Sequence, residues 1–280
     1  MYKVHALAES LKPYDVSLHV LLVDKPSSDL ESGQFNIYHL SELAKNELTG
    51  KIIKKYSGNK DKIRWGMKPL FLHYLLNQSI DELVYVDNDI FFYQSPEVIF
   101  QSFRNTDILL TPHFYPSDPV NNQNWLEANY RVGLYNAGFI GVNKNATDFL
   151  DWWGKCCLYS MKKSYWRGLF DDQKYLDLVP IQFNGVEVLK NKGLNIAGWN
   201  DHPEGSLAIS KKEIVFVHFA DLTLEKFSNP AHSLHSFYEE YIKTLRKYNP
   251  NYKYKKEHFS LRKIDAAWYF LKWKLIRLFE

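Results

Sequence analysis

The sequence predicts an α/β fold in a single domain, with a mostly parallel central sheet. Short apolar runs that are typical of buried strands alternate with longer stretches of helical character. Strands that alternate with helices usually form a parallel sheet with the helices packed on its faces. A chain of 280 residues can bury a large core, and no linker rich in proline, glycine and serine divides it. We therefore expect one domain over residues 1–245 and a separate tail over residues 246–280.

The individual elements follow from local patterns. A helix over residues 4–11 should end before Pro13, and proline also suits the first turn of a helix that opens at Lys68-Pro69. Apolar runs predict strands at residues 17–23, 35–40, 83–86, 108–110, 138–142 and 213–219, and further helices are expected at 147–160 and 172–178. Ligands bind at the carboxyl ends of strands in such sheets, where Asp24, Asp87 and His218 lie.

The charge is divided unevenly along the chain. The net charge is +3, yet residues 243–280 hold 11 Lys or Arg against 3 Asp or Glu, a net of +8. The preceding residues therefore carry −5, which gives no basis for a nucleic-acid groove in the body of the protein. The tail ends in AAWYFLKWKLIRLFE, where aromatic and basic residues alternate. Such a helix suits peripheral contact with an anionic membrane, and a basic helix packed back on the domain is an equal alternative.

The two cysteines and the hydropathy bear on the cellular compartment. Cys156 and Cys157 are adjacent, so they neither meet ordinary disulfide geometry nor have the spacing of a zinc site. No run of 18 or more apolar residues occurs, and the first residues lack the apolar core of a signal peptide. We expect a cytoplasmic protein, with the tail as the one candidate for contact with the inner face of a membrane.

The triplet Asp87-Asn88-Asp89 is the strongest chemical signal, because it directly follows an apolar strand. Two carboxylates at one strand tip repel each other unless a cation lies between them, and Mg²⁺ or Mn²⁺ prefers such oxygen ligands. The alternative is a turn with two solvated aspartates. Two other chemistries use closely spaced aspartates: phosphatases of the haloacid-dehalogenase type, with DxDx[TV] near the N-terminus, and two-metal nucleotidyl transfer. Both fit the position and surroundings of the triplet less well.

Six motifs occur in a characteristic order over residues 65–221: WGMKPLFLHYLL, VYVDNDIFFY, LYNAGFIGV, FDDQKYLD, LNIAGWN and FVHFAD. Together they resemble the glycosyltransferases of the GT-A (Rossmann-like) fold, and among these the family 8-like retaining enzymes of bacteria. The resemblance implies transfer of a hexose from a nucleotide-diphosphate sugar, with a UDP-sugar as the expected donor. A glycan or lipid-linked acceptor, as in polysaccharide biosynthesis, is the expected second substrate.

The resemblance also implies roles for individual residues. Asp87, Asp89 and His218 match the metal ligands, with Mn²⁺ favoured over Mg²⁺ because imidazole suits it better. Gln173 matches the residue near the anomeric carbon, and Asp172 a position that binds the donor sugar. The remaining donor-binding candidates are Asp24, Arg64, Lys68, Asn88, Asn136, Ala137, Gly138, Trp199 and Asn200.

Two departures from the pattern keep alternatives open. The sequence begins with the helix that is expected to follow the first strand of such folds, which supplies contacts to the base, so we expect either that this strand is missing or that the start is placed too late. The C-terminal HxxGxxKPW is reduced to His218 in FVHFAD. A non-catalytic protein that binds a nucleotide-sugar or carbohydrate is therefore the competing interpretation. Retention follows from the resemblance alone, and Asp171 or Asp172 acting as a general base would instead invert the sugar.

Overall fold

The computed structural model describes residues 1–23, 35–201 and 209–254. Residues Met1–Pro250 form one compact unit, and the residues from Asn251 onward form a second. Asp24 and most of the predicted basic tail lie outside the described residues, so those two predictions remain untested. None of the helices within the described ranges has both the length and the apolar character needed to cross a membrane.

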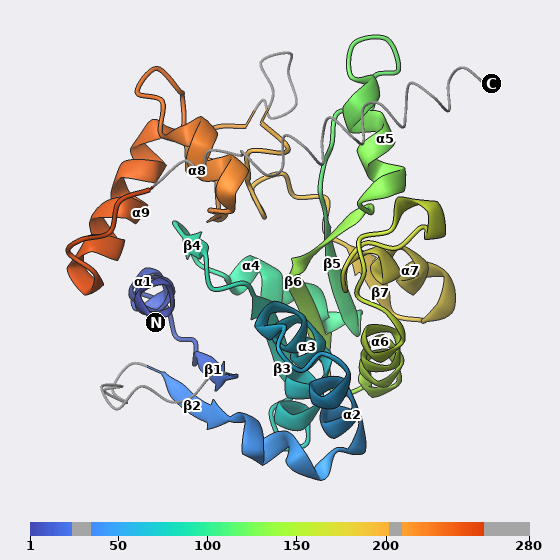
Figure 1. Cartoon of the computed structure of the whole chain (residues 1–280). Coiled ribbons are helices and arrows are strands. Elements are labelled where there is room, and N and C mark those ends of the chain that lie inside the picture. Colours follow the sequence, from blue (N-terminus) through green and yellow to red (C-terminus); the bar gives the residue numbers. More distant parts are fainter. Residues whose placement is uncertain (24–34, 202–208, 255–280) are drawn as a thin grey trace. The chain divides into compact units, whose positions relative to one another are not determined.

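The central sheet of the described chain has the strand order β3-β6-β5-β7 (Figure 1). Its strands are β3 (Glu82–Val86), β5 (Ile108–Pro112), β6 (Tyr135–Asn143) and β7 (Val186–Val188). Strand β6 runs antiparallel to both of its neighbours, and only β5 and β7 are parallel. The α/β class is confirmed, but the expectation of a mostly parallel sheet is wrong. Alternation of strands and helices does not fix strand direction, because the long connection from β5 through α5 (Gln123–Arg131) returns the chain in the opposite sense.

Two short strand pairs flank this sheet. Strand β1 (His19–Leu22) pairs in parallel with β2 (Asn36–His39), while β4 (Ile90–Phe92) pairs antiparallel with β8 (Phe216–His218). Strand β4 was not expected from the sequence. Its three residues directly follow the aspartate triplet, which was interpreted as the end of the preceding strand. The β4–β8 pair joins the first third of the chain to the last.

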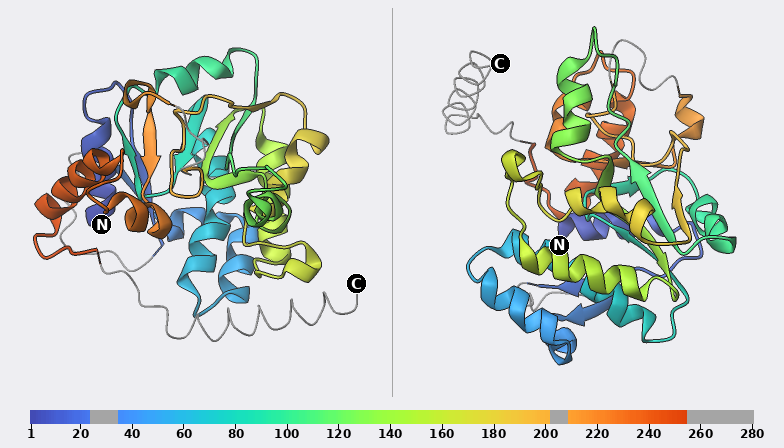
Figure 2. Two further views of the ribbon diagram at one scale, coloured as in Figure 1. Left: turned by 90° about the horizontal axis from the view of Figure 1, so that it is seen from above. Right: turned by 90° about the vertical axis from the view of Figure 1, so that its right-hand side faces the viewer.

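Helices pack on both faces of the central sheet. On one face, α3 (Lys60–Leu76) and α6 (Thr147–Tyr159) lie side by side with α2 (Glu47–Lys55) against them (Figure 2). The fully buried Trp153 and Phe149 of α6 lie in the core between these helices and the sheet. On the other face, α1 (Tyr2–Leu11) packs against β4, with Leu7 and Leu11 in a core that also holds Phe139 of β6.

Helix α3 is longer than the sequence pattern indicated. It begins at Lys60, where the side chain of Asn59 accepts a hydrogen bond from the Lys62 amide at 3.0 Å, and it ends at Leu76. The predicted start at Lys68-Pro69 is therefore wrong, and Pro69 lies inside the helix. Proline is favoured in the first turn of a helix, but its presence does not prove that a helix starts there. Here the Asn59 cap starts the helix earlier.

Helix α9 (His235–Tyr248) holds α1 in place. The rings of His5 and Tyr248 stack at 4.8 Å, and the Tyr248 hydroxyl donates to Glu9 at 2.6 Å. Lys247 forms an ion pair with the same Glu9 carboxylate. The N-terminal helix is thus anchored by the last helix of the unit.

The other described elements are short. They are α4 (Glu97–Phe100), α7 (Val179–Gln182), α8 (Asp221–Phe227) and the 3₁₀ helices η1 (Leu40–Lys45), η2 (Gln101–Arg104), η3 (Tyr165–Arg167), η4 (Lys174–Leu178) and η5 (Lys211–Glu213). The helix expected at residues 172–178 is η4, and the strand expected at 213–219 is confined to the three residues of β8.

Candidate functional site

Three side chains from three elements converge at one end of the sheet. Asp87 follows β3, Asp89 precedes β4, and His218 ends β8, where it is the register partner of Ile90. One ligand atom from each residue lies within 4.8 Å of the other two. The Nε2 atom of His218 is 3.1 Å from Asp89 Oδ1 and 3.9 Å from Asp87 Oδ2. The structure therefore brings together the three residues predicted as metal ligands.

The chemistry of this cluster fits a divalent cation. The His218 ring is buried, and its Nε2 atom faces both carboxylates. The possible ligand atoms of all three side chains therefore lie around one common point. Two carboxylate oxygens and one imidazole nitrogen form a donor set that Mn²⁺ accepts readily, whereas Mg²⁺ prefers oxygen alone. The cluster leaves other coordination positions for a ligand that contributes oxygen atoms.

Gly138 of β6 leaves the space that the cluster needs. A Cβ atom at this position would lie 2.6 Å from His218 Cε1 and 2.8 Å from Asp87 Oδ2. Any other residue would therefore push the ring and the carboxylate away from each other. The Gly138 amide also donates to Asn136 Oδ1 at 2.8 Å, and its carbonyl accepts the Asp87 amide at 2.9 Å. The backbone of β6 thus forms the wall of the cluster.

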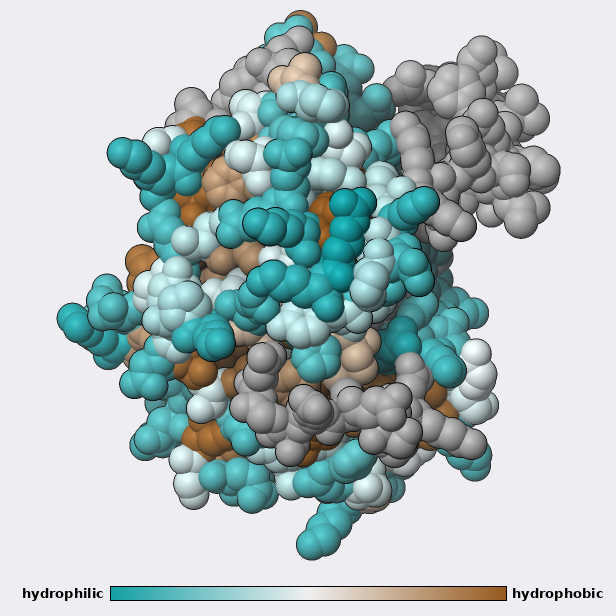
Figure 3. All heavy atoms as spheres, turned by 90° about the vertical axis from the view of Figure 1, so that its left-hand side faces the viewer, coloured by the Kyte–Doolittle hydropathy of each residue, from teal (hydrophilic) through white to brown (hydrophobic). Residues whose placement is uncertain are grey.

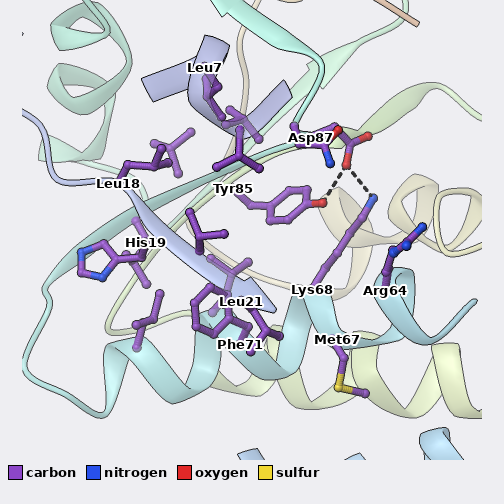
Figure 4. A pocket seen from close by; sticks show the side chains of 18 of the residues that line it. Leu7, Leu18, His19, Leu21, Arg64, Met67, Lys68, Phe71, Tyr85 and Asp87 are labelled. Carbon is purple, nitrogen blue, oxygen red and sulfur yellow. Dashed lines mark hydrogen bonds and ion pairs between the residues drawn. The ribbon is translucent and has the colours of Figure 1, made fainter. Parts of the chain in front are cut away.

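A buried ammonium lies directly behind the aspartates. Lys68 Nζ is 3.2 Å from Asp172 Oδ2 and 3.4 Å from Asp87 Oδ1, and it donates to the Ala137 carbonyl at 2.9 Å. Figure 4 shows Lys68 and Tyr85 both pointing at Asp87, and the Tyr85 hydroxyl donates to its Oδ1 at 2.6 Å. Burial alone would lower the pKa of Lys68, but the charges of Asp172 and Asp87 raise it well above its usual value. Lys68 remains protonated and neutralises part of the anionic cluster.

The surroundings of Asp89 and Asp172 shift the pKa values of the two carboxyl groups in opposite directions. Burial would raise the pKa of Asp89, but the charge and hydrogen bonds of His218 and Lys3 outweigh it and lower that pKa. Lys3 Nζ lies 3.2 Å from Asp89 Oδ2. Burial raises the pKa of Asp172, and the charge of Lys68 opposes this only in part. The charge of Asp89 is thus favoured by His218 and Lys3, whereas Lys68 offsets only part of the effect of burial on Asp172.

Asp171 is held in an unusual backbone conformation next to Asp172. Its φ of 48° lies in the left-handed region, which costs energy for a residue with a side chain and is adopted most readily by Asn and Asp. Lys163 forms an ion pair with its carboxylate at 3.2 Å. Burial raises the pKa of Asp171, and Lys163 opposes that shift.

A buried amide and imidazole network extends from the cluster along β6. Gln173 Oε1 accepts from the Ala137 amide at 3.2 Å and from Asn136 Nδ2 at 3.4 Å, while its Nε2 donates to the Val132 carbonyl at 3.2 Å. His113 joins Asn136 at 3.2 Å through Nε2 and the Gly133 carbonyl at 3.0 Å through Nδ1. Burial lowers the pKa of His113 to about 3, so its ring is neutral. Gln173 and Asn136 therefore lie beside the cluster as a fixed pair.

The other predicted donor-binding residues occupy varied positions. The Trp199 ring lies edge-on to His218 at 5.1 Å, whereas the Asn200 side chain is used within its own turn, accepting from the Ala197 amide at 2.9 Å. Arg64 is exposed and forms an ion pair with Asp61 at 2.9 Å. Asn88 is exposed between the two aspartates, and Asp24 lies outside the described residues.

Sequence reasoning missed three residues of this site: Lys3, Tyr85 and His113. Lys3 and Tyr85 contact the aspartates, but Lys3 lies outside the six motifs and Tyr85, although within VYVDNDIFFY, was interpreted only as part of the apolar strand. His113 offered one usable signal, since it directly follows the buried strand β5 in the way that Asp87 follows β3. A polar residue at the end of an apolar strand is a candidate for a site even without a motif.

A cavity of about 1000 Å³ opens beside the aspartates (Figure 4). Helices α1 and α3 and strands β1 and β3 line it, and Lys3, Arg64, Lys68, Asp87 and Asp89 lie at its polar end. This volume is at the upper end of the range for pockets that hold small organic ligands.

Comparisons with known proteins place the chain among uncharacterized relatives. No family model matches it. The solved structures it is similar to include mouse xyloside xylosyltransferase 1 in its apo form, with 15% identity, coverage of 79% of this chain and 92% of the other, and a TM-score of 0.49. They also include a glycosyltransferase involved in glycosylation of the major capsid of PBCV-1, with 13% identity, coverage of 81% and 100%, and a TM-score of 0.42. The galactosyltransferase LgtC with donor and acceptor sugar analogs shows 14% identity, coverage of 92% and 94%, and a TM-score of 0.42.

Two proteins of Bacillus subtilis (strain 168) are similar to it in sequence. The uncharacterized protein YfnD is 27% identical over 238 residues, which cover 80% of this chain and 74% of YfnD. The uncharacterized protein YfnF is 30% identical over 239 residues, which cover 79% of this chain and 77% of YfnF. On that identity and coverage, this chain belongs to the family of YfnF.

Proposed function

We propose that this protein is a metal-dependent glycosyltransferase that moves a hexose from a nucleotide-diphosphate sugar to a glycan or lipid-linked acceptor. The observation that carries the proposal is the convergence of Asp87, Asp89 and His218 beside a cavity large enough for a nucleotide. The ordered motifs over residues 65–221 support the same reaction, and they favour a UDP-sugar as the donor.

The cluster suits a diphosphate leaving group. A divalent cation held by Asp87, Asp89 and His218 would act as a Lewis acid that neutralises the charge developing on the diphosphate. Lys68 holds Asp87 and Asp172 in place from behind and keeps the cluster from excess negative charge. Lys3 and Arg64 line the polar end of the cavity, where two cations favour binding of an anionic donor.

The residues on β6 and η4 are suited to orient the sugar. The fixed amides of Asn136 and Gln173 lie beside the cluster, and the small Ala137-Gly138 segment allows a ligand to approach the backbone closely. In a transition state of oxocarbenium character most of the rate comes from such positioning and from electrostatic stabilisation. We assign Gln173 to the reacting face of the sugar and Asp172 to its hydroxyl groups.

The environment of Asp172 supports retention of configuration. An inverting reaction needs a carboxylate that takes a proton from the acceptor hydroxyl. Asp172 is buried and paired with the protonated Lys68, and Asp171 is paired with Lys163. Both carboxylates are buried and already bonded to an ammonium, so neither is open to an acceptor hydroxyl, and on this ground we propose retention.

The proposal is tested by a transfer and hydrolysis screen over UDP-, GDP- and dTDP-sugars with Mn²⁺, read by mass spectrometry of the products. We expect turnover with a UDP-sugar that is abolished by EDTA. Asp87→Asn and Asp89→Asn should each lower turnover at least about 100-fold, while circular dichroism and the melting temperature stay close to those of the unsubstituted protein. Asp81→Asn is the matched control, because Asp81 is exposed and pairs with Lys144 away from the cluster.

The outcomes separate the enzyme from the competing binder. Full turnover in the Asp87→Asn/Asp89→Asn double variant would refute the metal-dependent mechanism. Stabilisation by UDP and Mn²⁺ in a thermal shift assay, without turnover of any donor, would instead identify a non-catalytic nucleotide-sugar binder. The unfilled space beside β1 is the observation that favours this second function.

A further inference from the structure

A tight and exposed turn follows α6. The main chains of Ser164 and Leu169 exchange two hydrogen bonds, of 2.9 and 3.0 Å, which close the turn over residues 165–168. At its tip the side chain of Trp166 is 75% exposed, and that of Tyr165 is 40% exposed. Two large aromatic side chains thus face water on a segment whose main chain is fixed.

Basic side chains surround these rings. Lys162, Lys163 and Arg167 are exposed. Arg167 donates to the Tyr159 hydroxyl at 2.6 Å, and Tyr159 is itself 61% exposed. Residues 155–168 hold four Lys or Arg and no Asp or Glu. We call six side chains of this region the turn surface: Tyr159, Lys162, Lys163, Tyr165, Trp166 and Arg167.

The turn surface differs from ordinary scattered exposure. Isolated apolar side chains are common on protein surfaces, and Figure 3 shows them between polar ones on the side of α1, β1 and α9. In the turn surface, by contrast, three exposed aromatic side chains lie within residues 159–166. None of them lines the cavity beside the aspartates, so they do not belong to the site described above.

Positive charge continues from the turn surface onto α2 and α3. Lys55 of α2 donates to the Tyr159 carbonyl at 2.7 Å, which joins the ends of α2 and α6. Lys55 and Lys62 of α3 lie 5.7 and 5.6 Å from the centre of the Tyr56 ring. The Tyr56 hydroxyl accepts the Met161 amide at 3.1 Å, directly before the turn surface. The basic residues of the three helices therefore adjoin one another.

The charge of the protein is concentrated in this region. Residues 51–64 hold six Lys or Arg against one Asp, and together with residues 155–168 they carry a net of +9. Residues 1–242 carry −5 in all, so the rest of that range carries −14. An anionic surface attracts the first group and repels the second, and it would therefore orient the protein with the turn surface towards it.

The arrangement of the rings distinguishes between anionic partners. Arg167 lies 5.7 Å from the centre of the Tyr159 ring, and Lys163 lies 4.8 Å from that of Phe170. Tyr165 stacks on Phe170 with ring centres 6.1 Å apart. Single-stranded nucleic acids stack their bases on open ring faces, but here cations and a neighbouring ring lie over those faces. Tyr and Trp beside Lys and Arg instead match the interface of a lipid bilayer.

We propose that the turn surface docks the protein on an anionic lipid bilayer. Trp166 at the tip would enter the boundary between headgroups and acyl chains, where its ring is partly apolar and its N–H can still bond. Lys162 and Arg167 would pair with acidic headgroups, and the basic residues of α2 and α3 would widen the contact. This surface lies wholly within the described residues and is separate from the basic tail.

Docking at this place has a consequence for the acceptor. The turn leads directly into Asp171, Asp172 and Gln173, and Lys163 pairs with Asp171 at 3.2 Å. Of the two acceptor classes in the proposed function, this position favours the lipid-linked one. That consequence rests on the proposed function, whereas the docking itself does not.

Flotation of the full chain with large unilamellar vesicles tests the proposal. We expect binding to phosphatidylcholine vesicles that contain about 30% phosphatidylglycerol, because acidic lipids attract basic segments. Binding should be lost with phosphatidylcholine alone, or at about 1 M salt, which screens charges within about 3 Å. Lys162→Gln should lower the partition coefficient about fivefold. Trp166→Ser should lower it at least about fivefold, because a large apolar surface leaves the bilayer.

Lys144→Gln and Val98→Ser are the matched controls. Lys144 is exposed and pairs with Asp81 just before α6 begins, whereas the turn follows the end of that helix. Val98 is 41% exposed and lies on α4, and Figure 2 shows α4 and the segment after α6 on different sides of the unit. Both variants should bind the vesicles as the unsubstituted protein does.

A second measurement reports insertion rather than affinity. Lipid brominated on its acyl chains quenches the fluorescence of tryptophan that enters the bilayer, and Trp166→Phe keeps an aromatic side chain for binding. The chain has eight Trp, so the comparison between the two proteins is the readout. We expect a smaller quenched fraction in Trp166→Phe than in the unsubstituted protein.

Four outcomes would overturn the proposal. Absence of vesicle binding would show that the turn surface is simply solvated, and binding that Lys162→Gln and Trp166→Ser leave unchanged would assign it to another part of the chain. Equal quenching in Trp166→Phe would show that the turn stays outside the bilayer. Binding of dextran sulfate that Lys162→Gln weakens, without vesicle binding, would assign the surface to an anionic polysaccharide. None of these results depends on whether the protein transfers sugar.

Discussion

Gly138 illustrates how a residue without a functional group can control a site. It lies on β6 between the Asp87 carboxylate and the His218 ring, and both approach to less than 3 Å of where its Cβ would be. The same residue fixes the backbone of Asp87 through its carbonyl. The distance between two of the proposed metal ligands is therefore limited by a third residue that is not itself a ligand.

Gly138→Ala should weaken metal binding more than it weakens the fold. The added methyl group must displace the His218 ring or the Asp87 carboxylate, so we expect the affinity for Mn²⁺ to fall at least about tenfold. Isothermal titration calorimetry with Mn²⁺ measures this directly. Gly50→Ala is the control, because no atom lies within 4 Å of its added Cβ and alanine favours the helix α2 by up to about 1 kcal/mol. Unchanged Mn²⁺ affinity in Gly138→Ala would contradict the proposed ligand set.

His113 should make the protein sensitive to mild acid. Its folded-state pKa is lowered to about 3 by burial, whereas an unfolded histidine titrates near 6.5. The unfolded chain therefore binds a proton that the folded chain does not, and stability falls as the pH drops below 6.5 towards 3. Between pH 7 and 4.5 this one group should reduce the free energy of unfolding by roughly 2–3 kcal/mol.

Urea unfolding at pH 7 and pH 4.5 checks this expectation with His113→Gln. The variant should be less stable than the unsubstituted protein at pH 7, because it loses the bond to Gly133, yet its stability should fall less between the two pH values. An equal fall in both proteins would show that His113 does not carry the acid sensitivity.

At the residue scale, the sequence predicted side chains that lie within ordered motifs at strand ends. Asp87, Asp89 and His218 were found in this way and do converge. Lys3 and Tyr85 were missed because their role depends on contacts that only the folded chain creates. Lys3 reaches Asp89 across 86 residues of sequence, and no local pattern encodes that approach.

At the scale of elements, α3 shows how a cap overrides a weaker signal. Pro69 indicated a helix start, but the helix begins at Lys60, about two and a half turns before it, where Asn59 accepts from the Lys62 amide. Because α3 starts this early, Arg64 and Lys68 lie on the same helix. The strands were predicted more reliably than the helix boundaries, since a buried strand requires an apolar run while a helix end depends on one or two capping residues.

Removal of the Asn59 cap should lower stability without disturbing the site. Asn59→Ala leaves an amide of the first turn of α3 without its acceptor, which costs about 1 kcal/mol and lowers the melting temperature by about 2–4 °C. Differential scanning calorimetry measures this shift. Asn46→Ala removes the equivalent cap of α2 and should give a similar loss, because its side chain accepts from the Leu48 amide at 2.9 Å. A melting temperature of Asn59→Ala equal to that of the unsubstituted protein would contradict a role for this cap.

At the scale of the whole molecule, the class of fold was predictable but the direction of its strands was not. Alternating apolar runs and helical stretches specify an α/β chain, and the structure confirms this. Strand direction depends on which end of the sheet each connection returns to, and that choice is made by packing between distant segments. β6 therefore runs opposite to the expected direction, and β4 gains its place only by pairing with β8.

The β4–β8 pair has a consequence for the order in which the protein is made. More than 120 residues separate Asp89 from His218, and the ribosome releases the two aspartates long before it adds the histidine. Until β8 has been made, a nascent chain holds Asp87 and Asp89 without His218, and domains generally fold as units once their chain is complete. A cation bound as we propose would therefore gain its third protein ligand only after the segment from β4 to β8 has been synthesised and the two strands have paired.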